Sequence, residues 1–347
     1  MNITRKLWSR TADGKAIYKY KLTNGKGASV VLCNIGAGIV SVNVPDKDGK
    51  LADVCLSYRK PESYFHDGPC LGKCPGRFAN RINAGKFTLA GKQYSVPVNC
   101  GPNHLHGGPE GFANQVWESR KRNGGVEFKY VSADGEMGYP GNLVVVARYV
   151  WTEDNELQLS FTAKTDAETV VNLTNHAYFN LNGKGSVLRH YLKLNASEYL
   201  ATDDTLIPAG EPENVAGTPM DFQNAKTLGR DIKKDFPALN YGKGYDACWC
   251  LDGYMKGQLQ EAAELYSKTS GRVLKVFTTQ PGIQVYTGNW LGGCPVGKNG
   301  RIYKDYDGVA LECQHFPDSP NRPEYPSVVL KPGKTFHEAI IYAFSTL

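Results

Sequence analysis

Hydrophobic and polar residues alternate in short runs along most of this chain, and this pattern constrains its fold more than any other feature. Leu143–Trp151 and Leu157–Ala163 are alternating or rich in β-branched residues, and the polar segment Thr152–Glu156 between them predicts a hairpin. No long amphipathic repeat with a cap at each end occurs, and only Pro61–Phe65 predicts a helical turn, with proline at its first position. We therefore expect a chain built almost entirely of β-strands.

Further strand patterns are distributed from the N-terminus to the C-terminus. They are Ala16–Leu22, Ala28–Leu32, Ile39–Val44, Gln260–Leu265, Ala263–Ser267, Arg272–Phe277, Ile283–Tyr286, Val309–Cys313 and Ala339–Phe344. The 38 Gly and 19 Pro residues supply the turns that such strands need. Many antiparallel strands with few helices favour sheet packed on sheet, so the predicted fold class is all-β, a large antiparallel β-sandwich. No linker divides the chain, and Ile207–Pro219 is interpreted as a loop, so residues 1–347 are predicted to form a single domain.

Composition argues against several classes of function. The net charge is +6, but acidic and basic residues are interleaved without a basic stripe, which argues against a nucleic-acid partner and favours a neutral substrate. Nine cysteines without regular spacing indicate reduced thiols in a cytoplasmic protein. The N-terminus lacks an apolar leader, and the longest uncharged stretch, Gly27–Pro45, is interrupted by Asn and Gly. Neither a signal peptide nor a membrane span is therefore expected.

Two segments that are distant in the sequence carry the titratable groups of most interest. His176 lies within an alternation that would place Asn172 and Thr174 on its own face, a polar surface suited to a ligand with many hydroxyls. Glu312 follows the apolar run Val309–Leu311, so a carboxylate projects from a mostly buried strand. From these residues alone, His176 is either functional or part of a polar network, and Glu312 is either functional or paired in a buried salt bridge.

Histidines and cysteines elsewhere raise the question of a metal. His104 and His106 would lie on one side of an extended segment at a metal-ligand spacing, but no third ligand is evident, so no metal is predicted. The Cys70/Cys74 and Cys248/Cys250 pairs do not form Cys-x-x-Cys sites and are interpreted as core or loop thiols.

Arginines and amides add further candidates. Arg77 and Arg81 offer two guanidinium donors to hydroxyls, or alternatively form a surface arginine pair. Asp246 and Gln284 each add one polar group beside aromatic residues. Each of these motifs has low specificity when it is taken singly.

Taken together and in this order, the motifs resemble those of the aldose 1-epimerase (galactose mutarotase) family. The matching stretches are Gly76–Ile82, Asn103–Gly108, Gly138–Leu143, Asn172–Leu181, Asp204–Gly210, Gly217–Phe222, Tyr245–Asp246, Pro281–Asn289 and Leu311–Asn321. They extend over almost the whole chain, and their combination is far more specific than any one of them.

The resemblance implies a single-domain β-sandwich of the supersandwich (galactose mutarotase-like) type, with an open sugar cleft and no cofactor. It implies that Glu312 is the general base and His176 the general acid. The sugar-binding residues that it implies are Asn80, Arg81, His106, Asp246 and Gln284. The reaction would interconvert the α and β anomers of free aldohexoses such as galactose and glucose by acid/base-catalysed ring opening and closure. A small sugar would be the substrate, and the protein would be a monomer or a homodimer.

Two departures from the family's pattern leave the preferred sugar open. Ala247-Cys248 follows the Tyr-Asp pair where the family commonly has His-Asn. The segment Cys70–Pro75, ahead of the arginine motif, is also atypical.

Three other functions compete with an epimerase. A glycoside hydrolase would use Glu312 with Asp246 as its two carboxyls. A sugar-binding module would need neither an acid nor a base. An enzyme of hexose 6-phosphates would hold the phosphate with Arg77, Arg81 and Lys73.

Overall fold

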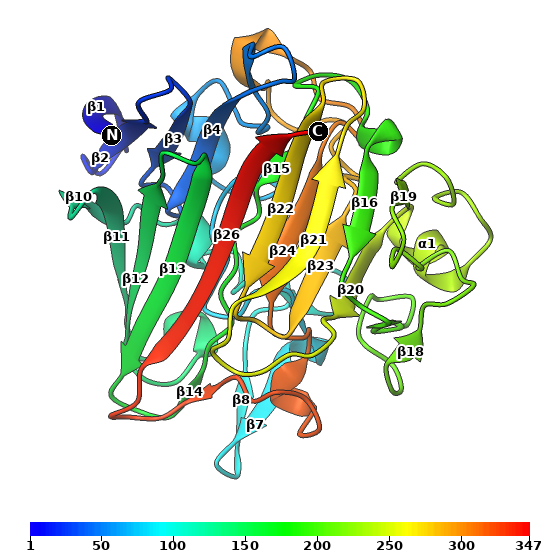
Figure 1. The fold of residues 1–347 in the computed structure, drawn as a ribbon. Coiled ribbons are helices and arrows are strands. Elements are labelled where there is room, and N and C mark those ends of the chain that lie inside the picture. The colour runs from blue at the N-terminus through cyan, green and yellow to red at the C-terminus, as the bar shows by residue number, and fades with distance from the viewer.

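The computed structural model describes residues 1–347 and contains three large antiparallel sheets with very little helix (Figure 1). The nine-stranded sheet contains, in spatial order, β10 (Glu118–Arg122), β11 (Gly125–Ser132), β12 (Leu143–Trp151), β13 (Glu156–Thr165), β26 (Phe336–Thr346), β22 (Arg272–Thr278), β21 (Gln260–Tyr266), β16 (Tyr191–Leu194) and β19 (Lys226–Thr227). The five-stranded sheet contains β1 (Asn2–Arg10), β2 (Ala16–Thr23), β3 (Ser29–Cys33), β4 (Gly38–Pro45) and β5 (Leu51–Asp53). The six-stranded sheet contains β15 (Tyr178–Phe179), β24 (Val309–Gln314), β23 (Gly282–Tyr286), β20 (Asp246–Cys250), β17 (Glu198–Tyr199) and β18 (Glu213–Asn214).

Short elements connect these sheets. Three strand pairs stand apart: β6 (Arg81–Ile82) with β9 (His104–Leu105), β7 (Lys86–Leu89) with β8 (Lys92–Ser95), and β14 (Thr169–Val170) with β25 (Val329–Leu330). The α-helix is α1 (Pro237–Gly242), and the 3-10 turns are η1 (Pro61–Tyr64), η2 (Asn83–Gly85), η3 (Phe112–Asn114), η4 (Glu136–Gly138), η5 (Val187–Arg189), η6 (Lys298–Gly300) and η7 (Ser319–Asn321). No helix is long and apolar enough to cross a membrane.

Alternating side chains explain why these segments become strands of a two-layered structure. Along β12, every second residue from Leu143 to Trp151 is buried, and the residues between them are more exposed. The predicted hairpin to β13 is present, with Leu143 paired with Thr165 and Trp151 paired with Leu157. One face of this sheet therefore enters the core, and the other meets solvent.

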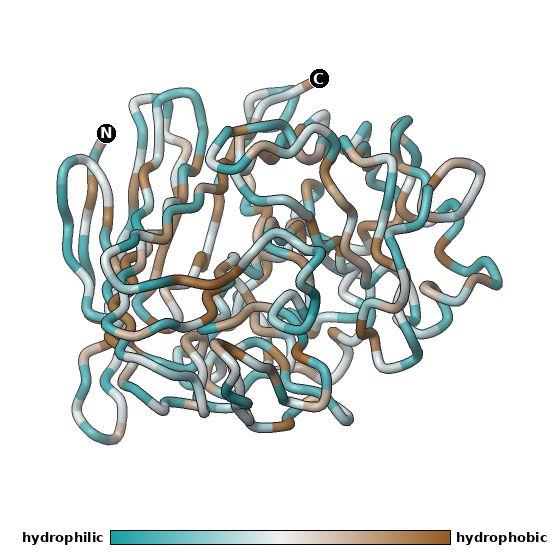
Figure 2. The backbone as a smooth tube through the Cα atoms, turned by 90° about the horizontal axis from the view of Figure 1, so that it is seen from below, coloured by the Kyte–Doolittle hydropathy of each residue, from teal (hydrophilic) through white to brown (hydrophobic).

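The six-stranded sheet packs against the nine-stranded sheet, and the five-stranded sheet extends the same second layer. Phe179 of β15 contacts Tyr342 and Phe344 of β26, with ring centroids 5.1 and 5.9 Å apart. An isolated bridge between Cys55 and Phe179 connects the five-stranded and six-stranded sheets. Many hydrophobic residues lie on the inner strands, whereas hydrophilic loops surround them (Figure 2). The predicted antiparallel β-sandwich is confirmed.

Most predicted elements are present, but several others were missed, including β11, in which Val126 and Phe128 alternate with charged residues. The predicted turn at Pro61–Phe65 corresponds to η1, and Gln260–Leu265 lies within β21. β1 was missed because its side chains remain largely exposed, so it shows no clear alternation. The helix α1 begins at Pro237, a proline signal at the first helical position that could have revealed it.

We propose that the chain forms a single domain. A core of 60 buried residues includes side chains from both layers, from Tyr20 in β2 to Phe344 in β26. A core shared in this way favours one folding unit.

The alternation along β12 can be tested with identical substitutions at neighbouring positions. Val145 is fully buried, whereas Val144 is 38 % exposed. Val145→Ala should lower the free energy of unfolding by about 1–3 kcal/mol, because it leaves a cavity in the core. Val144→Ala should change it by no more than about 0.5 kcal/mol. Denaturant unfolding measures both values, and equal losses would contradict this orientation of the strand.

Candidate active site

A cavity of about 330 Å³ brings together all the residues to which the sequence analysis gave a role in catalysis or sugar binding. Its lining includes Asn80, Arg81, His106, His176, Asp246, Gln284 and Glu312. Aromatic and apolar residues that were not predicted also line it, including Tyr178, Tyr286, Trp290, Leu206 and Leu105. These residues come from segments that are distant in the sequence, so the fold alone brings them together.

One face of the six-stranded sheet forms the floor of the cavity. Gln284 on β23 lies directly opposite Glu312 on β24, and its amide donates a 2.6 Å hydrogen bond to Asp246 on β20. The alternate residues Val285 and Leu311 point into the core instead. Glu312 lies within the regular, buried strand β24, so the carboxylate projects from a buried strand as the sequence predicted. Strand alternation thus gives the sheet one apolar face and one polar, functional face.

His176 is held by an irregular segment that precedes β15. Its backbone N–H donates to Lys73 O at 2.8 Å, and its carbonyl accepts from Gly72 N–H at 2.9 Å. The expected alternation is wrong here, because the side chain of Asn172 donates to Ala79 O and His315 O and does not line the cavity. Backbone contacts between neighbouring segments, and not a strand ladder, determine where the imidazole points.

His104 and His106 separate, contrary to the expectation that they share one side. His104 is fully buried, contacts Tyr139 Oη at 2.6 Å through Nε2, and has its pKa lowered by burial to about 4. His106 has a positive φ of 54°, which turns its side chain out of the extended pattern and towards the cavity. Burial, followed by the nearby His176, holds the pKa of His106 well below its usual range.

Asn80 and His106 form a reciprocal contact on one wall of the cavity. Both residues have a positive φ, 65° for Asn80 and 54° for His106. The Asn80 N–H donates to His106 Nδ1, and the His106 N–H donates to Asn80 O, each at 3.1 Å. Because Nδ1 accepts this bond, the proton of the neutral ring lies on Nε2.

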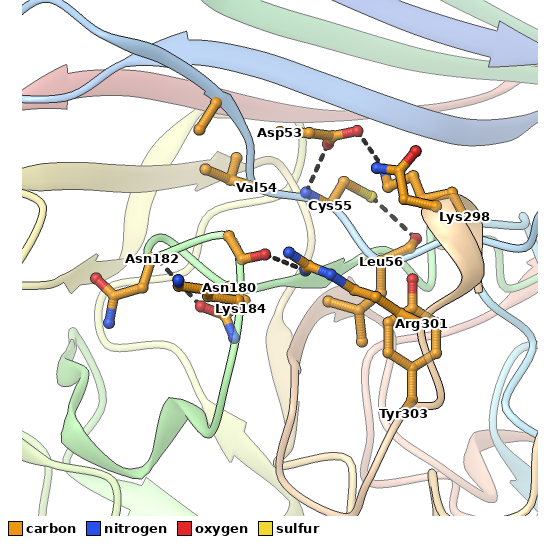
Figure 3. Close-up of a pocket in the computed structure, with 13 residues that line it drawn as sticks. Asp53, Val54, Cys55, Leu56, Asn180, Asn182, Lys184, Lys298, Arg301 and Tyr303 are labelled. Carbon is orange, nitrogen blue, oxygen red and sulfur yellow. Dashed lines mark hydrogen bonds and ion pairs between the residues drawn. The ribbon is translucent and has the colours of Figure 1, made fainter. Parts of the chain in front are cut away.

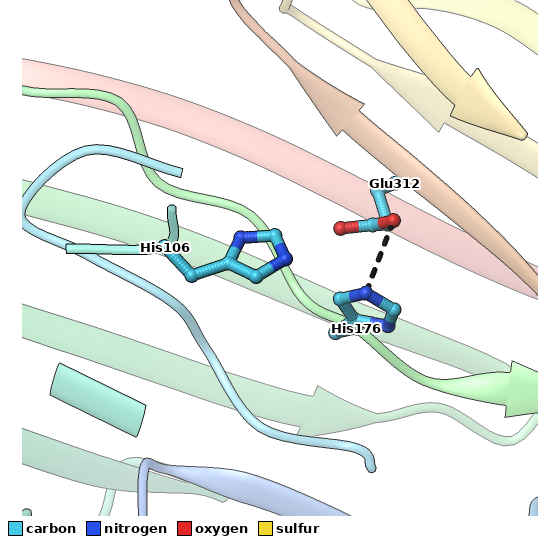
Figure 4. Close-up of side chains that lie close together, drawn as sticks. All are labelled: His106, His176 and Glu312. Carbon is cyan, nitrogen blue, oxygen red and sulfur yellow. Dashed lines mark ion pairs between the residues drawn. The ribbon is translucent and has the colours of Figure 1, made fainter. Parts of the chain in front are cut away.

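The side chains of His176 and Glu312 point toward one another (Figure 4), and both line the cavity. The distance from His176 Nε2 to Glu312 Oε1 is 3.4 Å, and the two residues are 5 % and 2 % exposed. Burial lowers the pKa of His176 to about 3. Burial, with a contribution from Asp246, raises the pKa of Glu312 well above its usual range, and Arg81 opposes this shift.

Three buried polar atoms at this site have no partner within the protein. They are His176 Nδ1, Glu312 Oε2 and Gln284 Oε1. A buried polar atom without a hydrogen bond is costly, so such atoms are rare unless a ligand satisfies them. Their convergence indicates a site for a small molecule rich in hydrogen-bonding groups.

The relationship to known proteins decides the family. The aldose 1-epimerase family model matches residues 18–343. The chain is 38% identical to galactose mutarotase of Sus scrofa over 99% of both chains, and 38% identical to aldose 1-epimerase of Escherichia coli over 96% of both. The chain belongs to the aldose 1-epimerase family. It is an isomerase that interconverts the α and β anomers of aldoses.

Solved structures agree with this assignment. A GalM/aldose epimerase homologue from C. elegans has a TM-score of 0.87 and 31% identity, covering 94% of this chain and 98% of that one. A galactose 1-epimerase from Lactobacillus acidophilus has a TM-score of 0.86 and 29% identity, covering 99% of both chains. The family resemblance and the fold class that were expected from the sequence are confirmed.

His106, His176 and Glu312 are close enough together to act as metal ligands. The sequence showed no third ligand beside His104 and His106, so it did not reveal this set. Their ligand atoms lie within 4.8 Å of one another. Nδ1 of His106 is occupied by the Asn80 N–H, so only its protonated Nε2 faces an ion. A cation requires a lone pair at the coordinating nitrogen, so this tautomer opposes coordination.

The two arginines of the Gly76–Ile82 motif have different surroundings, and neither belongs to a surface pair. Arg81 lines the cavity and lies 3.9 Å from Asp246. Arg77 is 1% exposed and donates to Pro140 O and Gly141 O at 2.7 and 2.9 Å. Arg77 therefore stabilises the fold, whereas Arg81 is available to a ligand.

Aromatic rings surround His176 and were missed by the sequence analysis. Tyr178 stacks on its imidazole with centroids 4.9 Å apart, and Tyr286 contacts it edge-on at 6.2 Å. Tyr286 lies two residues after Gln284 in β23, so strand alternation could have placed it on the same face. These rings exclude solvent from the imidazole and contribute to the low pKa of His176 through burial.

A second cavity, of about 200 Å³, lies apart from the site and shows no comparable set of free groups (Figure 3). Lys298 forms an ion pair with Asp53 and donates to Val40 O, and Arg301 donates to Gly183 O. These two cations are therefore satisfied within the protein.

A buried ion pair supports the segment that holds His176. Lys73 and Asp67 have side chains that are 1% and 0% exposed and form an ion pair. Lys73 also donates to Tyr64 O, and its charge contributes to the lowered pKa of His176. The atypical segment Cys70–Pro75 thus acts behind the site rather than within it.

Lys73→Met should lower the free energy of unfolding by about 3–5 kcal/mol, because it leaves the Asp67 carboxylate buried without a counter-charge. The double variant Asp67→Asn, Lys73→Met should lose less, because no uncompensated charge remains. Chemical denaturation measures both variants. A single variant as stable as the native protein would show that this pair contributes nothing to the fold.

Proposed function

We propose that the enzyme acts on free aldohexoses such as galactose and glucose, with Glu312 as general base and His176 as general acid. The observation that carries this proposal is the 3.4 Å contact between the two side chains at the bottom of a polar cavity, with unpartnered atoms on both. Both oxygens that exchange protons in the reaction are bonded to the anomeric carbon. Two adjacent titratable groups therefore suit this chemistry.

In the proposed reaction, Glu312 takes the proton of the anomeric hydroxyl, and the bond between C1 and the ring oxygen breaks. The electron pair of the former O–H bond forms the carbonyl, and the ring oxygen receives a proton from His176. Rotation about C1–C2 then exposes the other face of the aldehyde. The ring closes with the proton transfers reversed. Simultaneous donation matters because a carboxylate, with an ordinary pKa near ~4.3, is too weak to ionise a hemiacetal hydroxyl alone.

Burial sets the protonation state of the pair. It raises the pKa of Glu312 and lowers that of His176, so the neutral acid and the neutral imidazole are both favoured. In this state the two groups together carry one titratable proton, the same number as in the tautomer with a carboxylate and an imidazolium. Arg81 favours the carboxylate. We propose that a bound sugar, by hydrogen bonding to both groups, favours the tautomer that starts the reaction.

The other polar residues of the cavity are proposed to hold the sugar. Arg81 and His106 present donors, Gln284 presents the unpartnered acceptor Oε1, and Asp246, fixed by Gln284 and Arg81, presents acceptors. Asn80 contributes by fixing the ring of His106. Their loss should impair both binding and rate, because a misplaced sugar reacts slowly.

Galactose and glucose are proposed as substrates because both are aldohexoses and the relatives named above include a galactose mutarotase, a galactose 1-epimerase and an aldose 1-epimerase. Ala247 belongs to the core, and Cys248, which lies opposite Gln284 in the sheet, is buried; neither residue is part of the cavity lining. This departure therefore gives no reason to exclude either sugar.

The structure weakens the competing functions. Lys73 and Arg77 are buried with partners of their own, so they do not provide a phosphate site with Arg81. Asp246 is bound by Gln284 and lies against Arg81, while the partner of Glu312 is an imidazole instead of a second carboxyl. A sugar-binding module has no need for that pair.

The cellular compartment and the oligomeric state of the enzyme are also proposals. All nine cysteines are free thiols, which favours a reducing compartment, and we propose the cytoplasm. All the proposed site residues belong to one chain, so a monomer or a homodimer would each contain complete sites. We also propose a role in galactose metabolism. We further propose that the enzyme needs no cofactor and has no nucleic-acid or membrane partner.

Glu312→Gln and His176→Asn should each lower the rate of mutarotation by at least about 10²-fold, because each removes one proton-transfer group. Polarimetry on fresh α-glucose and α-galactose measures this loss, and unfolding transitions verify the fold. A matched control is the buried pair of His315 and Glu338, also 3.4 Å apart but outside the cavity. Glu338→Gln should retain activity when folded. Native-like activity of the Glu312 variant would refute the proposal.

Activity should form a plateau between an acidic and an alkaline limb, which the opposite pKa shifts of His176 and Glu312 move apart. On the acidic limb the pair gains a second proton, and burial of His176 places the pKa of this step below the ordinary imidazole value near ~6.5. On the alkaline limb the pair loses its remaining titratable proton, and burial of Glu312 places the pKa of this step above the ordinary carboxyl value near ~4.3. A profile of kcat/KM against pH reports these values for the coupled pair. An activity that rises through pH 6–7, as for a free imidazole acting as a base, would contradict this assignment.

A further inference from the structure

A second buried polar side chain lies on the strand that carries Glu312. Gln314 follows Glu312 by two residues in β24, so the two side chains emerge from the same face of the sheet. Two residues of a strand span about 6.6 Å, a separation that two long side chains can bridge. Gln314 is 0% exposed and does not line the sugar cavity. Its amide therefore lies beside the carboxyl group, in the interior of the protein.

Neither polar atom of the Gln314 amide has a hydrogen-bond partner. The residue opposite it in β23 is Gly282, where a Cβ would meet the Phe316 ring at 2.8 Å and Cys248 Sγ at 3.0 Å. Burial raises the pKa of the Cys248 thiol well above its usual range, so this neighbour is a neutral thiol, a weak hydrogen-bonding group. An amide that is buried without partners is costly, which indicates a partner that forms at another stage of the reaction.

The hydroxyl of Thr174 extends this row of unsatisfied groups. Its segment runs antiparallel to β24: His176 meets the strand at one end, and Asn172 Oδ1 accepts from the His315 N–H at 3.0 Å at the other. Thr174 therefore lies alongside Gln314, and two residues before His176 on the same side of the segment. Thr174 Oγ1 is buried without a partner as well. An unsatisfied neutral pair thus lies next to the titratable pair.

The acceptor that this amide lacks appears when Glu312 is ionised. The proposed reaction starts from the tautomer in which Glu312 is a carboxylate, but burial opposes that charge. A hydrogen bond donated to a carboxylate favours the charged form, and such bonds are stronger than those between neutral groups. Oε2 of Glu312 accepts no hydrogen bond within the protein. It is therefore free to accept one from a nearby amide.

We propose that Gln314 is a positioning residue whose amide donates a hydrogen bond to Glu312 Oε2 when that group is a carboxylate. Thr174 supports the amide by donating from Oγ1 to Gln314 Oε1. This inference rests on the proposed function, because it takes Glu312 to be the general base. As the carboxyl proton passes to His176, the new carboxylate gains the Gln314 donor. Proton transfer depends on this bond, whereas affinity for the sugar does not.

Gln314→Met removes the amide and keeps the length of the side chain. The alkaline limb of kcat/KM should move up by about one pH unit, because the carboxylate loses a donor, and the acidic limb should stay in place. The value of kcat should fall about tenfold with KM unchanged. Infrared difference spectra against the Glu312→Gln protein follow the protonated carboxyl band of Glu312 directly and should show the same shift.

Stability separates this role from a structural one. The amide has no partner in the resting protein, so Gln314→Met should not lower the free energy of unfolding. Thr174→Val should move the alkaline limb in the same direction, and Thr174→Ser should keep the native profile. A native alkaline limb and carboxyl band in Gln314→Met would overturn the inference, and a native profile in Thr174→Val would overturn the part assigned to Thr174.

Gln280→Met is the matched control. Gln280 is also 0% exposed, but its amide donates to the backbone oxygens of Leu173 and Cys313, at 3.2 and 2.7 Å. Its loss should lower stability without moving the alkaline limb, and equal shifts in both glutamine variants would overturn the specific role of Gln314. Retained activity of Glu312→Gln would refute the proposed catalytic roles instead, so the two failures are distinguishable.

Discussion

The contact between an imidazole and a carboxyl group in a buried cavity is the interaction on which the function of this protein depends. Burial disfavours the charged form of each group, and it shifts the pKa of His176 down and that of Glu312 up. These opposite shifts widen the pH range over which the pair keeps one titratable proton. One titratable proton shared between an acid and a base suits a reaction that moves protons between two oxygens bonded to the same carbon.

The two-layered fold makes this contact possible at acceptable cost. The six-stranded sheet presents Val309 and Leu311 to the core while Glu312 faces the cavity, so one strand serves both stability and chemistry. His176 comes from a non-strand segment that is held by the backbone of Gly72 and Lys73. The strand and the segment are each fixed by neighbours that lie outside the cavity, so the site itself can retain unsatisfied polar atoms.

The sequence predicted the strands and the site residues with different success, for physical reasons. Strands such as β12 were found because burial on one face leaves a period of two in the sequence. The alternation failed around Asn172, where side-chain hydrogen bonds to distant carbonyls replace a sheet ladder. His104 and His106 were expected on one side, but the left-handed backbone of His106 itself turns its side chain away from that of His104. The aromatic wall around His176 was missed because an aromatic residue in a strand has the same pattern in a core and in a binding site.

The sequence by itself determined that the chain is all-β, which family it resembles and which side chains are capable of acid–base chemistry, because periodicity and residue type are local properties. Only the tertiary structure decided which groups meet. The 3.4 Å contact of His176 with Glu312, the withdrawal of Arg77 into the interior and the exposure of Trp290 all depend on packing between distant segments. Burial also decided the protonation of the pair, because a pKa depends on the surroundings that the whole fold creates.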